Sequence, residues 1–186
     1  MDFVSGPEDF STSPSKALSE IDKDWKKLPG LIVFGSHAQH DVGEKLEMLR
    51  EAREKKIPTL GICFGLHLQA VEWARNVLNL PDANSTEIKR MCADPVVVKL
   101  PELRVGIHKA EGRYESFWHN YRVNPVYYPQ FYKEWNLSTT GDMLDSMTLK
   151  GHPHYTGVQY HPEYGSSKDK PHPVLKRFLD VCRNAV

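Results

Sequence analysis

Two short apolar runs separated by one amphipathic segment constrain the fold of this chain most strongly. The runs span residues 31–35 (LIVFG) and 59–62 (TLGI), and each has the length and apolar content of a strand buried on both faces. Between them, residues 43–56 place apolar side chains at helical spacing, and Pro58 ends that pattern. A strand, helix and strand in so short a space imply parallel strands joined by a crossover. The sequence therefore predicts an α/β fold of three layers, with a mostly parallel sheet flanked by helices.

The rest of the chain extends this pattern within one predicted domain, residues 1–186. Residues 64–80 predict a second, more apolar helix, and residues 173–184 predict a last, amphipathic helix. Further strands are expected at residues 96–100, 121–126 and 155–160. Residues 1–15 are rich in Ser, Pro, Asp and Gly, and this composition predicts a loose arm.

Charge and composition exclude several classes of partner. Twenty-four Lys and Arg residues balance 24 Asp and Glu residues, so no net field attracts nucleic acid or an anionic membrane. No run approaches the roughly 20 apolar residues needed to cross a bilayer, and the polar N-terminus lacks the regions of a signal peptide. We therefore expect a cytoplasmic protein that binds a small molecule. The three cysteines and nine histidines lack disulfide or zinc spacing, so we expect no metal and no cofactor.

The pentapeptide GICFG, residues 61–65, places a cysteine where a predicted buried strand passes directly into a helix. A nucleophile elbow needs small residues two positions before and after the nucleophile, and Gly61 and Gly65 meet this requirement. At a helix N-terminus the helix dipole favours the thiolate of Cys63, and the amide of Phe64 faces a developing oxyanion. The alternative is that Cys63 is only a small buried side chain at a strand–helix junction.

A second motif, HPE at residues 161–163, directly follows the last predicted strand. Because parallel strands end at the same edge of a sheet, His161 is expected beside Cys63. A histidine there takes the thiol proton and later protonates the leaving amine, while Glu163 holds the imidazole in one tautomer and orientation. The two motifs together favour a cysteine hydrolase whose catalytic residues are Cys63, His161 and Glu163.

These motifs resemble those of the class I glutamine amidotransferases. GICFG and GVQYHPE are similar to the nucleophile and His/Glu motifs of that family. Three longer segments are similar to the glutaminase domain of the CTP synthase branch: IPTLGICFGLHLQAVEWARNVLNLPDANSTE, YRVNP and GHPHYTGVQYHPEYGSSKDKPHPVLKRFL. The resemblance extends from about residue 30 to the C-terminus. It implies a flavodoxin-like fold and an amide hydrolase that uses a thioester intermediate.

The resemblance also implies roles for individual residues. The residues that match the family's triad are Cys63, His161 and Glu163. Glu87 matches the glutamate of the ANSTE segment, which in the family contacts the α-amino end of the substrate. Gly35 matches a loop glycine whose amide completes the oxyanion hole together with the amide of Phe64.

Several departures from the family pattern concern the oxyanion loop and the substrate contacts. The family's PGGFG loop reads FGSHA here, so Ser36 stands beside Gly35 where the family has a second glycine. His67 stands where a glutamine helps to hold the substrate, and Asn120 stands where an arginine clamps the α-carboxylate. Loss of such a clamp removes an interaction worth about 1.5–3 kcal/mol unless Arg122 replaces it. The implied substrate is glutamine or a related γ-glutamyl or small amide in an altered pocket.

The length before residue 31 is a further departure. The family has a strand, a helix and a second strand in that region, whereas thirty residues precede residue 31 here. The resemblance therefore implies that part of the usual N-terminal sheet is missing. Because an uncovered sheet edge invites association, a homodimer or a partner subunit is expected to cover it.

Two functions of different classes remain open. The first is a cysteine-dependent amidohydrolase, which the three matching triad residues favour. The second is a catalytically weak or inactive binding or regulatory subunit, which keeps the fold while the altered loop and the lost clamp abolish turnover.

Overall fold

A six-stranded mixed sheet forms the centre of the structure, a computed structural model that describes residues 2–4, 14–34 and 41–185. The strands, in spatial order, are β1 (Asp2–Val4), β2 (Leu31–Val33), β3 (Thr59–Ile62), β9 (Tyr155–Val158), β8 (Met143–Leu149) and β7 (Trp135–Thr140). The first four run parallel to one another, and β8 and β7 are antiparallel to their neighbours. The predicted α/β fold with a mostly parallel sheet is confirmed.

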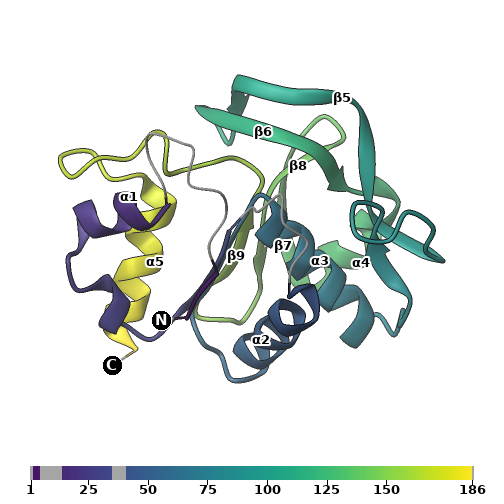
Figure 1. Cartoon of the computed structure of the whole chain (residues 1–186), viewed down its shortest axis with the longest axis horizontal. Helices are drawn as coiled ribbons and strands as arrows, with labels where there is room; N and C mark the ends of the chain where they lie inside the picture. Colours follow the sequence, from purple (N-terminus) through teal and green to yellow (C-terminus); the bar gives the residue numbers. More distant parts are fainter. Residues whose placement is uncertain (1, 5–13, 35–40, 186) are drawn as a thin grey trace.

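Helices cover both faces of this sheet, as Figure 1 shows. On one face lie α2 (Val42–Glu54) and α3 (Phe64–Asn76), and on the other lie α1 (Pro14–Ile21) and α5 (Pro173–Asn184). Alternate residues of β2 point to opposite faces, as the pleat of a strand requires. Leu31 and Val33 pack in the core on the side of α2 and α3, whereas Ile32 packs with α1 and α5. Both faces of the central strands are therefore buried.

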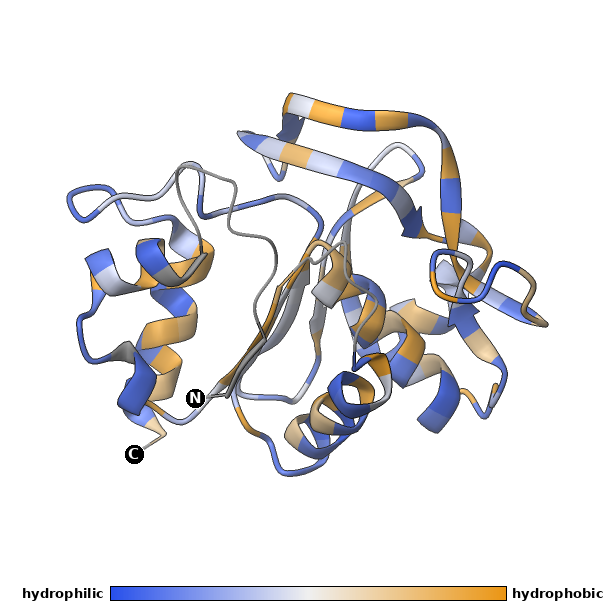
Figure 2. Ribbon diagram, viewed as in Figure 1, coloured by the Kyte–Doolittle hydropathy of each residue, from blue (hydrophilic) through white to orange (hydrophobic). Residues whose placement is uncertain are grey.

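Hydropathy along the ribbon explains why α2 and α3 differ in exposure (Figure 2). In α2, charged side chains alternate with the apolar residues Leu46, Leu49 and Ala52, which are buried. In α3, residues 64–74 are all buried. Because α3 lies between the central sheet and a second sheet, it is buried on all sides, and its polar side chains His67, Gln69 and Glu72 are buried with its apolar ones.

The second sheet is dominated by a long hairpin that lies across one end of the central sheet (Figure 1). It consists of β4 (Ala83–Ser85), β5 (Asp94–Ala110) and β6 (Arg113–Val123). The turn residues Glu111 and Gly112 both have positive φ, as the favoured two-residue hairpin turn requires. The sequence predicted only short strands at 96–100 and 121–126, because the rest of the hairpin exposes one face that mixes apolar with charged residues.

Several further elements were not predicted from the sequence. They are the antiparallel pair β7 and β8, helix α4 (Tyr128–Glu134), and the 3₁₀ helix Pro125–Tyr127. The sequence also predicts a helix over residues 15–27, and the structure has there α1, which ends at Ile21, followed by the 3₁₀ helix Trp25–Lys27. The predicted loose arm over residues 1–15 is corrected at residues 2–4, which pair in parallel with β2 and form the edge strand β1, and at Pro14, where α1 begins. Residues 5–13 lie outside the described residues. Coverage of this edge by a second copy or a partner stays a prediction.

No helix in the described part of the chain combines the length and the apolar character needed to cross a membrane.

Candidate active site

Cys63 occupies the junction between β3 and α3. Its backbone has φ 54° and ψ −104°, a conformation that residues other than glycine rarely adopt. Its N–H donates a hydrogen bond to the carbonyl of Val158 in β9, with an N to O distance of 2.7 Å. Its side chain does not cap α3, so the sulfur is directed elsewhere. The amide of Phe64 is the first of α3 and therefore has no acceptor in a preceding turn of that helix.

Two glycines make this backbone conformation possible. A Cβ atom on Gly65 would lie 2.0 Å from the carbonyl oxygen of Val33. A Cβ atom on Gly61 would lie 2.8 Å from the carbonyl carbon of Gly65 and 2.5 Å from Oε1 of Gln69. No real Cβ atom tolerates such distances, so the tight turn at Cys63 depends on both glycines, as the elbow pattern predicted.

His161 and Glu163 lie in the loop that follows β9. Nδ1 of His161 and Oε1 of Glu163 are 2.8 Å apart, and the Glu163 side chain is only 4% exposed. The backbone N–H of His161 donates to the carbonyl of Ser116 in β6 at 2.8 Å, which attaches this loop to the hairpin. The ring of Tyr164 stacks on the imidazole with a centroid distance of 5.2 Å. The imidazole is therefore held from several sides.

The electrostatic environment of His161 connects it with Cys63. Burial by itself would lower the pKa of His161, but hydrogen bonds and charges from Cys63 and Glu163 outweigh burial and raise this pKa to about 10. Its Nε2 atom is buried and makes no well-directed hydrogen bond to the described residues. It nevertheless lies near the Cys63 sulfur, which contributes to the raised pKa of His161. Two motifs far apart in the sequence thus meet at one end of the sheet, with the His161 imidazole beside the Cys63 sulfur.

Two neighbours of the sulfur were not identified from the sequence. Nε2 of Gln159 lies 3.7 Å from Sγ of Cys63, and the backbone carbonyl of Trp118 accepts from the thiol at 3.7 Å. Gln159 directly follows β9 and lies within the GVQYHPE motif, so the motif itself was the signal that could have found it. Trp118 contributes a backbone atom, and no side-chain pattern reveals that.

Two buried histidines lie near this site and are neutral. His67, one turn into α3, is 2% exposed, and burial lowers its pKa to about 4. His119, on the inner face of the hairpin, is 4% exposed, and burial lowers its pKa to about 3. Nδ1 of His119 donates to the carbonyl of Tyr121 at 2.7 Å, and its Nε2 is buried without a partner among the described residues. His119 was not predicted, because its orientation depends on the hairpin.

The residues expected to contact substrate or oxyanion have different environments. Glu87 follows β4, which packs against α3, and burial raises its pKa to about 7. Asn120 is exposed on the face of β6 opposite His119, and Arg122 pairs with Asp142. The side chain of His67 is enclosed and bonded to Gln159 rather than open to solvent. The two remaining candidates, Gly35 and Ser36, lie outside the described residues.

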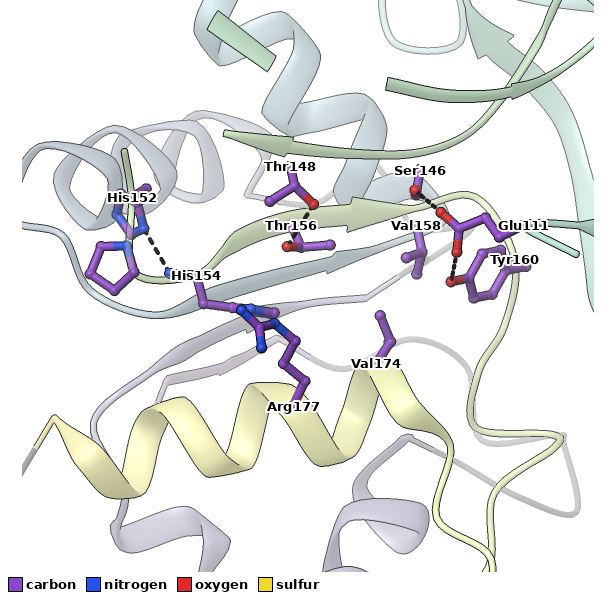
Figure 3. A pocket seen from close by; sticks show the side chains of 11 residues that line it. Glu111, Ser146, Thr148, His152, His154, Thr156, Val158, Tyr160, Val174 and Arg177 are labelled. Carbon is purple, nitrogen blue, oxygen red and sulfur yellow. Dashed lines mark hydrogen bonds between the residues drawn. The ribbon is translucent and has the colours of Figure 1, made fainter. Parts of the chain in front are cut away.

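A separate cavity of about 200 Å³ lies between α5 and the strands β8 and β9 (Figure 3). At one end, the Glu111 carboxylate accepts hydrogen bonds from Ser146 and from the hydroxyl of Tyr160, the latter at 3.0 Å. At the other end, His154 and Arg177 lie close to each other. Cys63, His161 and Glu163 do not line this cavity, so it is not the candidate active site. In the described part of the chain, no group of three His, Cys, Asp or Glu residues is arranged to hold a metal ion.

Comparison with known proteins defines the family to which this chain belongs. The model of the family "Glutamine amidotransferase class-I" matches residues 10–181. The chain therefore belongs to the class I glutamine amidotransferase family.

Among curated proteins, the chain is similar to CTP synthases. That of Prochlorococcus marinus (strain MIT 9215) is 34% identical over 186 residues, covering 85% of this chain and 35% of the relative. Those of Thermomicrobium roseum and Thermosipho africanus are 33% and 34% identical and cover 90% and 82% of this chain. The chain spans about a third of the length of these relatives, 35% in each case.

Solved structures confirm the fold. The CTPS glutaminase domain of Trypanosoma brucei, with bound acivicin, superimposes with a TM-score of 0.79 at 21% identity and covers 92% of this chain and 76% of its own. A putative GMP synthase protein from Thermoplasma acidophilum has a TM-score of 0.55 at 18% identity, covering 90% of this chain and 79% of its own.

Proposed function

We propose that this protein is a cysteine-dependent amidohydrolase that cleaves the side-chain amide of glutamine or of a related γ-glutamyl or small amide. The observation that carries the proposal is the arrangement of Cys63, His161 and Glu163. Cys63 lies at a strained elbow, and Glu163 holds Nδ1 of His161 at 2.8 Å. Burial would lower the pKa of His161, but Cys63 and Glu163 raise it to about 10, so the imidazole beside the sulfur is protonated at neutral pH.

The reaction follows from these groups. The Cys63 thiolate attacks the amide carbon, and the carbonyl oxygen gains negative charge that the Phe64 amide stabilises. The His161 imidazolium then donates its proton to the leaving nitrogen, the C–N bond breaks, and ammonia or an amine departs from the acyl-thioester. Neutral His161 next takes a proton from water, the resulting hydroxide equivalent attacks the thioester, and the free carboxylate leaves Cys63 as thiolate.

Substrate recognition differs from the pattern that the resemblance implies. Glu87 is proposed to contact the amino end of the substrate. With Asn120 in the position of the arginine clamp, and Arg122 paired with Asp142, a charged contact to an α-carboxylate is missing among these residues. This supports a substrate other than free glutamine, and it is also the observation that favours the second candidate function, a binding or regulatory module without turnover.

The length of the curated relatives supports a proposal about partners. The curated relatives carry about two thirds of their length outside the region that matches this chain. If the relatives use ammonia released by this domain, a partner chain or a further domain is proposed to receive it here. Association through the β1 edge, by a second copy or by that partner, is part of the same proposal.

The test is turnover of a panel of γ-glutamyl amides, glutamine included, measured as release of ammonia or amine. We expect at least one amide to be hydrolysed, and Cys63→Ala to abolish hydrolysis. We expect His161→Gln to lower the rate by about 10²- to 10⁴-fold, since it removes general acid–base catalysis. Failure of every amide, together with no acyl adduct on Cys63 by mass spectrometry, would favour the binding module.

A further inference from the structure

Gln159 and His67 form a buried pair behind the Cys63 sulfur, and neither belongs to the proposed triad. Gln159 follows β9 and is 1% exposed, while His67 lies in α3 and is 2% exposed. Nε2 of His67 and Oε1 of Gln159 are 2.8 Å apart, and Nε2 of Gln159 is 3.7 Å from Sγ of Cys63. A chain of hydrogen bonds therefore runs from α3 through Gln159 to the nucleophile.

The direction of these hydrogen bonds matters because the nitrogen and the oxygen of a primary amide have different roles. Its nitrogen donates hydrogen bonds and its oxygen only accepts them. While Oε1 of Gln159 accepts from His67, the N–H group of Gln159 points at the sulfur. With the amide reversed, a carbonyl oxygen would face the sulfur and repel a thiolate. His67 is neutral, so one ring nitrogen carries the proton. With Oε1 of Gln159 facing Nε2 at 2.8 Å, the proton is on Nε2, and this contact competes for it with the backbone of Tyr121, the other hydrogen-bond partner of the ring.

Gln159 and the Trp118 carbonyl have opposite effects on the ionisation of the thiol. The carbonyl of Trp118, 3.7 Å from Sγ, can only accept a hydrogen bond and therefore favours the protonated thiol. The N–H of Gln159 favours the thiolate, since a hydrogen bond to the charged form of a group stabilises that form. Without this N–H, His161 would have to counteract the effect of the Trp118 carbonyl without help from Gln159.

We propose that Gln159 is a positioning residue that directs an N–H group at the Cys63 thiolate, and that His67 sets the orientation of the Gln159 amide. This inference rests on the proposed function, in which the thiolate is the nucleophile. It gives His67 a role behind the sulfur in place of the direct substrate contact expected from its position in the family motif.

The experiment measures the rate of Cys63 alkylation by iodoacetamide as a function of pH, without any substrate. Mass spectrometry of peptides separates Cys63 from Cys92 and Cys182, the other free cysteines. The matched variant is Gln159→Met, which has a similar volume but no N–H donor. We expect the midpoint of its profile to rise by about one pH unit, so that alkylation below both midpoints is about tenfold slower.

His67 is tested with two variants. His67→Leu cannot donate to Gln159, so its midpoint is expected to rise as in Gln159→Met. His67→Gln keeps a donor, so its midpoint is expected to stay nearer that of the wild type. A purely structural role of His67 would lower thermal stability in both variants without separating their midpoints. Because both residues act through the same series of hydrogen bonds, the double variant His67→Leu/Gln159→Met is expected to shift the midpoint no further than either single variant.

His161→Gln distinguishes failure of this inference from failure of the proposed function. If His161→Gln shifts the midpoint and Gln159→Met does not, the role of Gln159 is refuted while the thiolate–imidazolium pair stands. If neither variant shifts it, both proposals fall. Should Gln159→Met not fold, as judged by near-ultraviolet circular dichroism, the comparison of His67→Leu with His67→Gln decides the inference.

Discussion

At the scale of single residues, the strained backbone of Cys63 is what makes the elbow. A non-glycine residue with positive φ costs of the order of 1–3 kcal/mol, and such strain persists only where the surroundings determine it. Here β3, β9 and α3 do so, through the hydrogen bond from Cys63 N to the Val158 carbonyl and the close approach of Gly65 to Val33. The position of the Cys63 nucleophile thus depends on the lack of a side chain at Gly61 and Gly65.

A substitution at Gly65 tests this dependence. In Gly65→Ala the new Cβ would meet the Val33 carbonyl oxygen at 2.0 Å, so either the elbow or β2 must move. We expect a loss of at least about 1–3 kcal/mol in the free energy of unfolding, measured by urea denaturation. The control is Gly43→Ala in α2, where nothing lies within 4 Å of the new Cβ. It should stabilise the protein by up to about 1 kcal/mol, because alanine favours helix. Equal stability of the two variants would contradict the steric account.

At the scale of elements, the hairpin of β5 and β6 is attached to the loop before α5 by one buried carboxylate. Glu115 in β6 accepts hydrogen bonds from Nε2 of His172 at 3.0 Å and from Arg113 at 2.9 Å. The other ring nitrogen of His172 accepts from the N–H of Val174 and caps α5 at 3.3 Å. Because the cap requires Nδ1 to accept, Nε2 is the nitrogen whose N–H donates to the Glu115 carboxylate. The same loop contains His161, whose N–H donates to the carbonyl of Ser116, the residue next to Glu115.

Removing the charge of Glu115 should loosen the hairpin. In Glu115→Gln the amide cannot accept from both partners with a charge-assisted bond, so we expect a loss of about 1–3 kcal/mol and faster hydrogen exchange in β6. Unfolding in urea and amide exchange followed by mass spectrometry measure these effects. Glu102→Gln, at an exposed position of β5, is the matched control and should change stability by less than about 0.5 kcal/mol. The attachment would be unimportant if both variants behaved alike.

At the scale of the whole molecule, three histidines from distant parts of the chain are buried in the neutral state: His67 in α3, His119 in β6 and His154 in the turn before β9. Burial lowers the pKa of His67 and of His154 to about 4 and that of His119 to about 3. Once unfolded, each of them binds a proton near its ordinary pKa of about 6.5. Between about pH 6.5 and 4 these three histidines therefore hold more protons in the unfolded chain than in the folded protein, and the stability that they contribute falls as the pH falls.

The contribution of His154 can be isolated, because it lies away from the candidate active site. The free energy of unfolding of the wild type should decrease on acidification from about pH 6.5 to 5, and His154→Gln should show a shallower decrease. The limiting difference in slope is about 1.4 kcal/mol per pH unit, which corresponds to one proton. Urea denaturation at half-unit pH intervals measures both slopes. Parallel slopes would show that His154 is already protonated, or solvated, in the folded protein.

Much of the fold was predictable because it depends on local periodicity. The apolar run at residues 59–62 and the spacing of residues 173–184 specify a strand and a helix wherever they lie, and the structure has both. The hairpin was not predictable in its full length, because its strands stabilise each other and leave large apolar residues such as Ile107 exposed. Its inner face, which carries His119, follows from that pairing and not from any local pattern.

The sequence by itself determined the features that act within a few residues: the two glycines around Cys63, the spacing of His161 and Glu163, and the parallel strands that end at one edge. Only the tertiary structure decided which groups surround the sulfur. Gln159, His67 and the Trp118 carbonyl come from different elements, and their contacts depend on the directions in which buried side chains and one backbone carbonyl point. Those directions result from packing of the whole chain, which no local pattern encodes.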